Sequence, residues 1–306
     1  MEKTVNFLNE HREKLAGTLH VPESGTDRAV LWGHCFTCSR HTTVLRDISK
    51  KLEERGIASL RFDFSGNGQS EGDFSHTSYT RHIGEMKQAM SFLSDLGFVR
   101  FAAGGHSMGA AIALLAAERM AAESLNIKAV CALAGRLGSG RISQLFSDRQ
   151  MEELRQTGKV SFVSRGRKLE LREDFFTDMQ QYDLSATVAN LKIPLMVIHG
   201  DKDEVIAVQN ALEAKERNPA IELEIIAGAD HMFPESSAPG TKIAELDSMV
   251  FRKFFLPESE ASQNGKFGSL KLIIPFCENL LYRFSFEIIR SFNHKGHEDG
   301  SKITTN

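Results

Sequence analysis

Several features that mark other classes of protein are scarce or missing from this sequence. Its 306 residues include four cysteines, Cys35, Cys38, Cys131 and Cys277, which are too few and too scattered for a disulfide framework. No uncharged apolar run approaches the roughly 18 residues of a membrane span, and residues 1–4 do not begin a signal peptide. The net charge of −3 provides no basic field for nucleic acid. We therefore expect a soluble, cytoplasmic protein that does not bind nucleic acid.

The remaining composition is that of an ordinary globular protein, with 41% hydrophobic and 25% charged residues. The length allows one large α/β domain or two small ones. Short apolar runs predict strands at residues 5–7, 15–19, 29–32, 57–62, 99–103, 128–134, 195–198 and 221–226. Helical spacing predicts helices at residues 43–54, 80–96, 110–120, 206–217 and 242–255. After an initial hairpin, strands alternate with helices, which predicts an α/β fold with a doubly wound, mostly parallel sheet.

The alternation is interrupted twice, and the interruptions suggest domain boundaries. Residues 137–190 are polar and charged, carry scattered aromatic side chains and are too long for a plain connection. We interpret them as a cap inserted into a core of residues 1–136 and 191–257. Residues 258–306 contain a polar linker and an amphipathic helix at 276–292. We expect that helix to pack on its own domain or on a partner subunit, as in a homodimer, with a membrane surface as the alternative.

The most informative stretch is Gly-His-Ser-Met-Gly at residues 105–109. It follows an apolar strand and precedes a helix rich in small residues, which is the setting of a nucleophile elbow with the pattern G-x-S-x-G. The two glycines leave room for strand and helix to pass closely, and the amides at the helix start can stabilise negative charge beside Ser107. We predict that Ser107 is a nucleophile, the alternative being a glycine-rich turn with a helix-capping serine.

A serine nucleophile needs a base, and the base needs a group that orients it. His231 lies in the turn after the strand at 221–226, and Asp201 and Asp203 follow the strand at 195–198. All of these side chains therefore stand at the carboxyl ends of predicted parallel strands. The order serine, acid, histidine is that of the α/β-hydrolase fold. The pattern alone leaves the choice between Asp201 and Asp203 open.

Other polar motifs receive more ordinary interpretations. We expect His106 to pack against the elbow, and histidines away from these strand ends, among them His20 and His82, to lie on the surface. Cys35 and Cys38 form a C-x-x-C motif, which occurs in redox and zinc sites, but no second Cys/His pair completes a metal site. We expect neither a metal nor an organic cofactor, and a redox role for the cysteines stays open.

From residue 29 to about residue 256, the sequence resembles α/β-hydrolases of the dienelactone-hydrolase-like group. Residues 59–72, SLRFDFSGNGQSEG, and 228–231, GADH, resemble cinnamoyl (feruloyl) esterases. Residues 34–39, HCFTCS, and 61–64, RFDF, resemble the hydrolase domain that occurs fused to OsmC-type domains. The chain after residue 257 is too short for an OsmC-type domain, so the resemblance implies no peroxide chemistry.

This resemblance implies roles for particular residues. Ser107 matches the family nucleophile and His231 the general base. Asp203 matches the acid, because the family acid stands three residues after the strand-end glycine. The backbone amides of Met108 and Phe36 match the oxyanion hole, in which two donors face the oxygen that becomes negative during the reaction.

The function implied is that of a carboxylesterase-type serine hydrolase (EC 3.1.1). It would cleave small-molecule esters with small to medium acyl groups or aromatic groups. A thioesterase, or an amide or peptide hydrolase, would use the same triad, because the leaving group is selected by the cap and the pocket. A binding module that has kept the fold without catalysis is the alternative from another class of protein.

Overall fold

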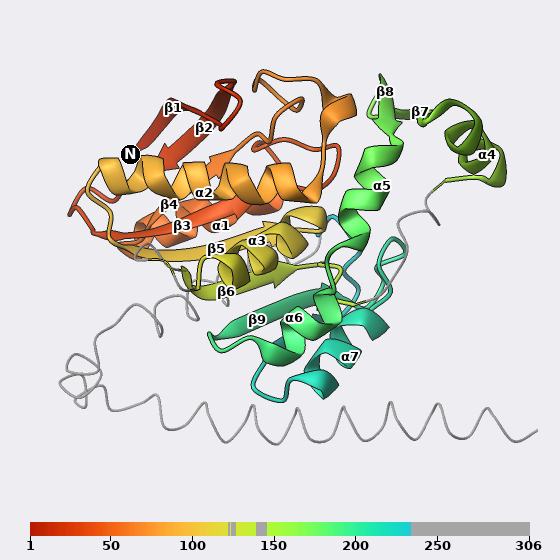
Figure 1. Cartoon of the computed structure of the whole chain (residues 1–306). Helices are drawn as coiled ribbons and strands as arrows, with labels where there is room; N and C mark the ends of the chain where they lie inside the picture. The colour runs from red at the N-terminus through yellow and green to blue at the C-terminus, as the bar shows by residue number, and fades with distance from the viewer. Residues whose placement is uncertain (122, 124–126, 139–145, 234–306) are drawn as a thin grey trace, which may run out of the picture. The chain divides into compact units, whose positions relative to one another are not determined.

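The computed structural model describes residues 1–121, 123, 127–138 and 146–233 (Figure 1). All of them belong to the first of the two units into which the chain divides, Met1–Phe255. The helices predicted at 242–255 and 276–292 lie outside the described residues. Within the described ranges, no helix is both long enough and apolar enough to span a bilayer.

An eight-stranded sheet forms the centre of this unit, in the order β1-β2-β4-β3-β5-β6-β9-β10. Its strands are β1 (Glu2–Leu8), β2 (Lys14–His20), β3 (Arg28–Gly33), β4 (Ala58–Phe62), β5 (Arg100–His106), β6 (Ile127–Leu133), β9 (Leu195–Gly200) and β10 (Glu222–Ile226). Strand β2 pairs antiparallel with both β1 and β4, and the strands from β4 to β10 pair in parallel. The predicted hairpin and the doubly wound, mostly parallel sheet are therefore confirmed.

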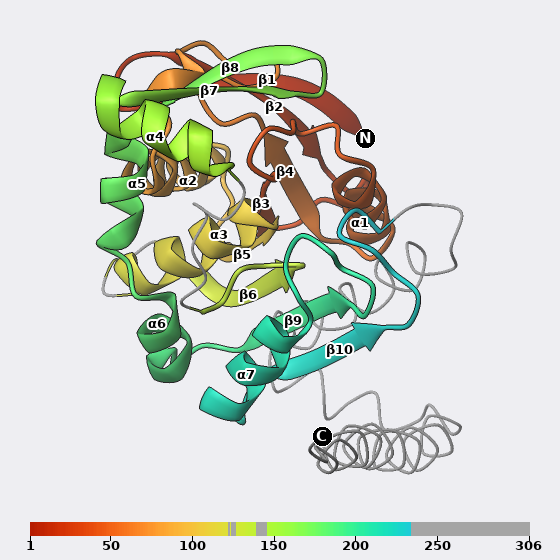
Figure 2. The same ribbon diagram turned by 90° about the vertical axis from the view of Figure 1, so that its right-hand side faces the viewer.

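Helices cover both faces of the sheet, as the continuous apolar strands require. Figure 2 shows α2 (Tyr79–Asp95) and α3 (Met108–Arg119) on one face and α1 (Thr43–Glu54) on the other. Each face has its own apolar cluster of buried side chains. Helix α3 is buried over its first ten residues, where alanines let it lie close to β5 and β6. That close approach places the start of α3 directly at the end of β5.

Among the described residues between β6 and β9, the chain forms five elements. They are α4 (Asp148–Thr157), the strands β7 (Lys159–Ser164) and β8 (Arg167–Arg172), α5 (Glu173–Gln180) and α6 (Leu184–Asn190). Strands β7 and β8 form a separate antiparallel hairpin. Figure 1 shows α5, β7 and β8 beyond the end of the sheet to which its parallel strands point. The insertion is therefore placed at the edge where ligands bind in such sheets.

Two histidines expected on the surface are buried instead. The His20 side chain is 1% exposed, and its Nδ1 lies 2.9 Å from Glu53 Oε2. His82 lies on the buried face of α2, with its ring nitrogens 2.6 Å from Thr77 Oγ1 and 3.0 Å from Glu85 Oε2. The surface prediction is wrong because each ring has polar partners within the fold, so its nitrogens stay hydrogen-bonded when the ring is buried.

Candidate active site

Ser107 lies between β5 and α3 in a backbone conformation that side chains rarely adopt. Its φ is 58° and its ψ is −115°. A non-glycine residue with positive φ carries strain, and such strain is concentrated at functional sites. Two backbone hydrogen bonds hold the turn, since the Ser107 amide donates to Leu133 O at 2.9 Å and Ser107 O accepts from the Ala110 amide at 3.1 Å. The strand–turn–helix geometry expected for the elbow is present.

The glycines on either side of Ser107 are required by close contacts between backbones. A Cβ placed on Gly105 would lie 2.2 Å from the carbonyl group of Gly109. A Cβ placed on Gly109 would lie 2.2 Å from Gly33 O, at the end of the neighbouring strand β3. Both obstacles are backbone atoms that cannot rotate away, so a side chain at either position would force the elbow apart.

Replacing Gly109 with alanine should lower the free energy of unfolding by about 3 kcal/mol, because the elbow backbone must shift. Gly84 provides the matched control, since a Cβ there would meet nothing nearer than Glu10, at 3.6 Å. Gly84→Ala should raise stability by about 0.5–1 kcal/mol, because Gly84 lies within α2. Urea denaturation of both variants measures the two changes, and equal effects would contradict the backbone contact.

Asp203 and His231 are brought together although they lie on different loops. His231 Nδ1 is 2.8 Å from Asp203 Oδ2, and His199 Nε2 is 3.2 Å from the same oxygen. The other carboxylate oxygen accepts hydrogen bonds from the amides of Val205 at 2.9 Å and Ile206 at 2.8 Å. The carboxylate side chain is fully buried, whereas His231 is 12% exposed. The histidine is thus held by a fixed acid and keeps one accessible edge.

This environment keeps Asp203 ionised. Burial by itself raises the pKa of the Asp203 carboxyl, but hydrogen bonds from His199, His231 and the Ile206 amide outweigh burial. The pKa therefore lies below its ordinary value. A carboxylate at this position can orient the His231 ring and stabilise a positive charge on it.

The structure also separates the two candidate acids. Asp201 Oδ1 accepts a hydrogen bond from the Gly228 amide at 2.7 Å, which joins the loops after β9 and β10. Asp203 is the carboxylate that contacts His231. His199, which contacts Asp203, was not predicted from the sequence to belong to the site. Its position at the end of β9, four residues before Asp203, was the only available signal.

His106 connects the elbow to the loop of His231. Its Nε2 donates to His231 O at 2.7 Å, and the two ring centroids are 4.9 Å apart. The residue next to Ser107 in sequence therefore contacts the backbone of His231. Burial, and then the charge of His231, lower the pKa of His106 to about 3. This agrees with the expected packing role for His106.

Comparisons with known proteins agree with the fold of the chain. Residues 29–138 match the Hydrolase_4 family model, described as serine aminopeptidase S33. The mouse (Mus musculus) protein named palmitoyl-protein thioesterase ABHD10, mitochondrial, is 23% identical over 255 residues, covering 81% of this chain and 82% of the relative. Among solved structures, Est1E from Butyrivibrio proteoclasticus with bound ferulic acid has a TM-score of 0.69 at 20% identity, covering 82% of this chain and 98% of that one. The esterase domain of a Rhodothermus marinus protein has a TM-score of 0.63 at 23% identity, covering 83% of this chain and 99% of that domain.

The chain has the α/β-hydrolase fold. The fold that the resemblance to α/β-hydrolases implied is thereby confirmed. The identities are low, so these similarities concern the fold, and the substrate of each relative remains a statement about that relative.

The loop after β3 carries the predicted oxyanion donor Phe36. The Phe36 ring lies between the core and the insertion, with its centroid 5.3 Å from that of Phe175 on α5 and 6.1 Å from that of Phe162 on β7. Phe74 of the core packs on the same ring at 5.4 Å. Met108, the other predicted donor, is the first residue of α3 and directly follows Ser107. The oxyanion roles themselves stay predictions.

Cys35 and Cys38 form a disulfide that encloses Phe36. Their Cα atoms are 5.2 Å apart, and the Cys38 amide donates to Cys35 O at 3.1 Å, which closes a tight turn. The sequence left a redox role for this motif open and gave no support to a metal site. The disulfide constrains the backbone on both sides of Phe36, whose amide is the predicted oxyanion donor.

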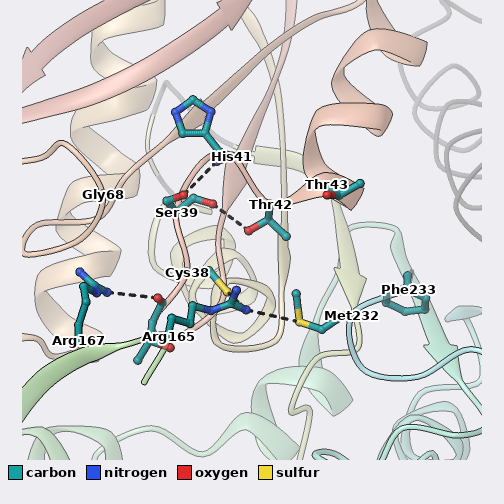
Figure 3. Close-up of a pocket in the computed structure, with 11 residues that line it drawn as sticks. Cys38, Ser39, His41, Thr42, Thr43, Gly68, Arg165, Arg167, Met232 and Phe233 are labelled. Carbon is teal, nitrogen blue, oxygen red and sulfur yellow. Dashed lines mark hydrogen bonds between the residues drawn. The ribbon is translucent and has the colours of Figure 1, made fainter. Parts of the chain in front are cut away.

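A pocket of about 650 Å³ lies beside the loops of Phe36 and His231 (Figure 3). Its walls come from the loop after β3, the tip of the β7–β8 hairpin and the segment after His231. The lining residues are Thr37, Cys38, Ser39, His41, Thr42, Thr43, Gly68, Arg165, Arg167, Met232 and Phe233. The site therefore has a pocket of mixed polar and apolar lining next to the loop that carries Phe36.

Two buried histidines, His34 and His106, should make the free energy of unfolding depend on pH. His34 Nδ1 donates to Cys35 O at 2.7 Å and its Nε2 accepts from the Phe64 amide at 3.0 Å, so a proton on Nε2 would break a hydrogen bond. Burial lowers the pKa of His34 to about 4 and that of His106 to about 3. In the unfolded chain both groups have a pKa of about 6.5 and bind protons that the folded protein excludes. The contribution of these two neutral rings to the free energy of unfolding is therefore fully present above about pH 6.5 and is lost as the pH falls toward 4.

His34 and His106 together should lower the free energy of unfolding at pH 5.5 relative to pH 7.5 by about 2–3 kcal/mol, about 1.4 kcal/mol from each. Urea denaturation at both pH values measures the difference. His106→Gln should reduce this difference by about 1.4 kcal/mol, whereas a change at the exposed His11 should leave it as it is. Equal stability of the wild-type protein at the two pH values would contradict the buried neutral rings.

Proposed function

We propose that this chain is a serine carboxylic-ester hydrolase in which Ser107, His231 and Asp203 form a catalytic triad. The observation that carries the proposal is the 2.8 Å contact between Asp203 and His231, held beside an elbow on which Ser107 has a φ of 58°. The contact of His106 with His231 O supports the same arrangement, because it connects the elbow to the histidine loop. The order of the three residues in the chain is that of α/β-hydrolases.

In the proposed reaction, His231 Nε2 removes the proton from Ser107 Oγ, and the oxygen attacks the ester carbonyl. Asp203 holds the ring through Nδ1 and stabilises the imidazolium ion that forms. The amides of Phe36 and Met108 donate hydrogen bonds to the carbonyl oxygen as it becomes negative. His231 then gives its proton to the leaving alcohol, and water, activated by the same histidine, hydrolyses the acyl-enzyme.

The proposed substrates are esters with small to medium acyl groups or with aromatic groups. The rings of Phe36, Phe74, Phe162 and Phe175 lie together where the insertion meets the core, and flat apolar groups pack well against such rings. Est1E, whose fold is similar, was solved with ferulic acid. We further propose that residues 137–190 act as the cap that selects the acyl group.

A thioesterase is the second candidate, because the mouse relative is named a palmitoyl-protein thioesterase. The proposed triad can attack a thioester as well as an ester, since the two acyl groups present the same electrophilic carbonyl. We also propose a cytoplasmic location for this chain, although the name of the mouse relative includes the word mitochondrial.

A hydrolysis panel on the purified full-length protein tests these proposals. The panel compares 4-nitrophenyl esters of increasing acyl length, a methyl cinnamate ester, an acyl thioester and an acyl anilide, each measured beside Ser107→Ala. Faster turnover of the esters supports the proposed function, and faster turnover of the thioester would favour the second candidate. Absence of turnover and of labelling by a fluorophosphonate would leave a non-catalytic binding module as the conclusion.

A further inference from the structure

The pocket beside the proposed active site carries a concentration of positive charge. Arg165 stands at the turn between β7 and β8, with a φ of 51° followed by a φ of 74° at Gly166, which folds the hairpin tip back sharply. Arg167 begins β8. Figure 3 shows both arginines at the pocket, facing the loop after β3. His41 lines the same pocket, and none of the eleven lining residues is acidic.

Most of the hydrogen-bonding capacity of these two arginines is unused. Among the described residues, neither guanidinium group makes an ion pair with a carboxylate. Arg165 Nη2 contacts only sulfur atoms, Cys38 Sγ at 3.3 Å and Met232 Sδ at 3.9 Å. Arg167 Nη2 donates to Thr37 O at 3.3 Å. Each guanidinium has five N–H donors in a planar fork suited to a carboxylate, so both groups can accept an anionic partner.

The opposite wall of the pocket is also favourable to an anion. Thr42 and Thr43 are the cap and the first residue of α1, and the first turn of this helix has no acidic side chain. The Thr42 hydroxyl donates to Ser39 O at 2.8 Å instead of capping the helix amides. The positive end of the α1 dipole therefore adds to the field of the arginines.

The pocket lies close to the proposed catalytic residues. Met232 and Phe233, which line it, directly follow His231, and Thr37 directly follows Phe36. Arg165 Nη2 lies 3.9 Å from Sδ of Met232, the residue after His231. A group bound by Arg165 would therefore lie next to the loop of His231, the residue that would protonate the leaving alcohol.

We propose that this pocket binds a carboxylate on the leaving-alcohol part of the substrate, with Arg165 and Arg167 as the residues that recognise it. This inference rests on the proposed ester hydrolysis and assigns its substrate class, an ester whose acyl part is apolar and whose alcohol part is anionic. The aromatic rings around Phe36 receive the acyl part, and the arginine pocket receives the charged alcohol part.

The test compares two esters with the same butyryl group, 4-nitrophenyl butyrate and 3-carboxy-4-nitrophenyl butyrate, which differ by one carboxylate on the leaving group. The measured quantity is the ratio of kcat/KM for the charged ester to kcat/KM for the neutral ester. Arg165→Gln and Arg167→Gln should each lower this ratio by about five- to tenfold, the range expected for a partly exposed charge-assisted hydrogen bond. General damage to the protein would lower both values and leave the ratio unchanged.

Lys168→Gln is the matched control, because Lys168 neighbours Arg167 on β8 but is exposed and does not line the pocket. This variant should keep the wild-type ratio. A second measurement needs no variant, since raising the ionic strength from about 0.05 to 0.5 M should lower the wild-type ratio by screening. An unchanged ratio in both arginine variants would overturn the proposal.

Two further measurements distinguish recognition of the leaving group from recognition of the acyl group, and anion binding from ester hydrolysis. If Arg165 and Arg167 affect instead the mono-4-nitrophenyl ester of suberic acid, whose carboxylate is on the acyl part, the assignment to the leaving group is wrong. If the wild-type protein cleaves no ester, the proposed function fails by itself. Calorimetric titration of the full chain with 5-hydroxy-2-nitrobenzoate, the charged leaving group, then still tests the pocket, and binding that the arginine variants do not weaken would overturn it.

Discussion

Replacing Ser107 with alanine is expected to lower kcat for ester hydrolysis by about 10⁴-fold or more, because the acyl-enzyme can no longer form. The side chain is small, and the alanine backbone would occupy the same turn, so the fold should be retained. Initial rates with 4-nitrophenyl butyrate measure the loss, and circular dichroism with thermal unfolding verifies that the protein is folded.

Ser161→Ala is the control for this experiment, because Ser161 is an exposed residue of β7. It should keep the wild-type rate. A folded Ser107→Ala protein that still cleaved esters at the wild-type rate would show that the nucleophile lies elsewhere. Retained labelling of that variant by a fluorophosphonate would identify the other nucleophile directly.

Replacing Asp203 with asparagine is expected to lower kcat by about 10³- to 10⁴-fold, because an amide cannot stabilise the imidazolium ion or hold His231 in the required tautomer. Asp201→Asn should change kcat by less than about threefold. The Asp201 oxygen that accepts from the Gly228 amide at 2.7 Å is retained as the amide oxygen of asparagine. Steady-state kinetics of the two variants, measured in parallel, compare these outcomes.

This pair of variants removes the same charge at positions two residues apart, so a general electrostatic effect would change both rates similarly. Equal losses at Asp201 and Asp203 would contradict the proposed role of Asp203. A loss confined to Asp201→Asn would reverse the assignment. Since the pKa of Asp203 is held below its ordinary value, this carboxyl should stay ionised and the wild-type rate should not be limited by its loss of charge near neutral pH.

The regular elements of the core were predictable because their determinants are local. The apolar runs at β3, β5 and β9 are continuous over several residues, which indicates strands covered on both faces. The spacing of Val44, Ile48 and Leu52 predicted α1 with the bounds that the structure shows, Thr43–Glu54. The ends of other elements differed by a few residues, since terminal turns depend on tertiary contacts.

The insertion between β6 and β9 was the part of the fold that sequence reasoning resolved least. Its polar composition suggested an inserted cap without specifying its elements, and the structure contains helices and the β7–β8 hairpin there. Phe162 and Phe175 are separated in the sequence and meet only around Phe36 of the core. Because these aromatic side chains are scattered along the insertion and meet only through tertiary packing, their spacing shows no clear helical or strand period.

The sequence by itself determined the α/β fold, the elbow around Ser107 and the placement of acids and a histidine at strand ends, because strand and helix periodicity and glycine-bearing turns are written in neighbouring residues. Only the tertiary structure decided that Asp203, and not Asp201, contacts His231, that His199 holds the same carboxylate, and that Arg165 and Arg167 face the loop after β3. The contacts of Asp203 with His231 and of Arg167 with the loop after β3 join segments 28 and 130 residues apart. They depend on how loops of similar composition turn in space, and a linear pattern does not specify that.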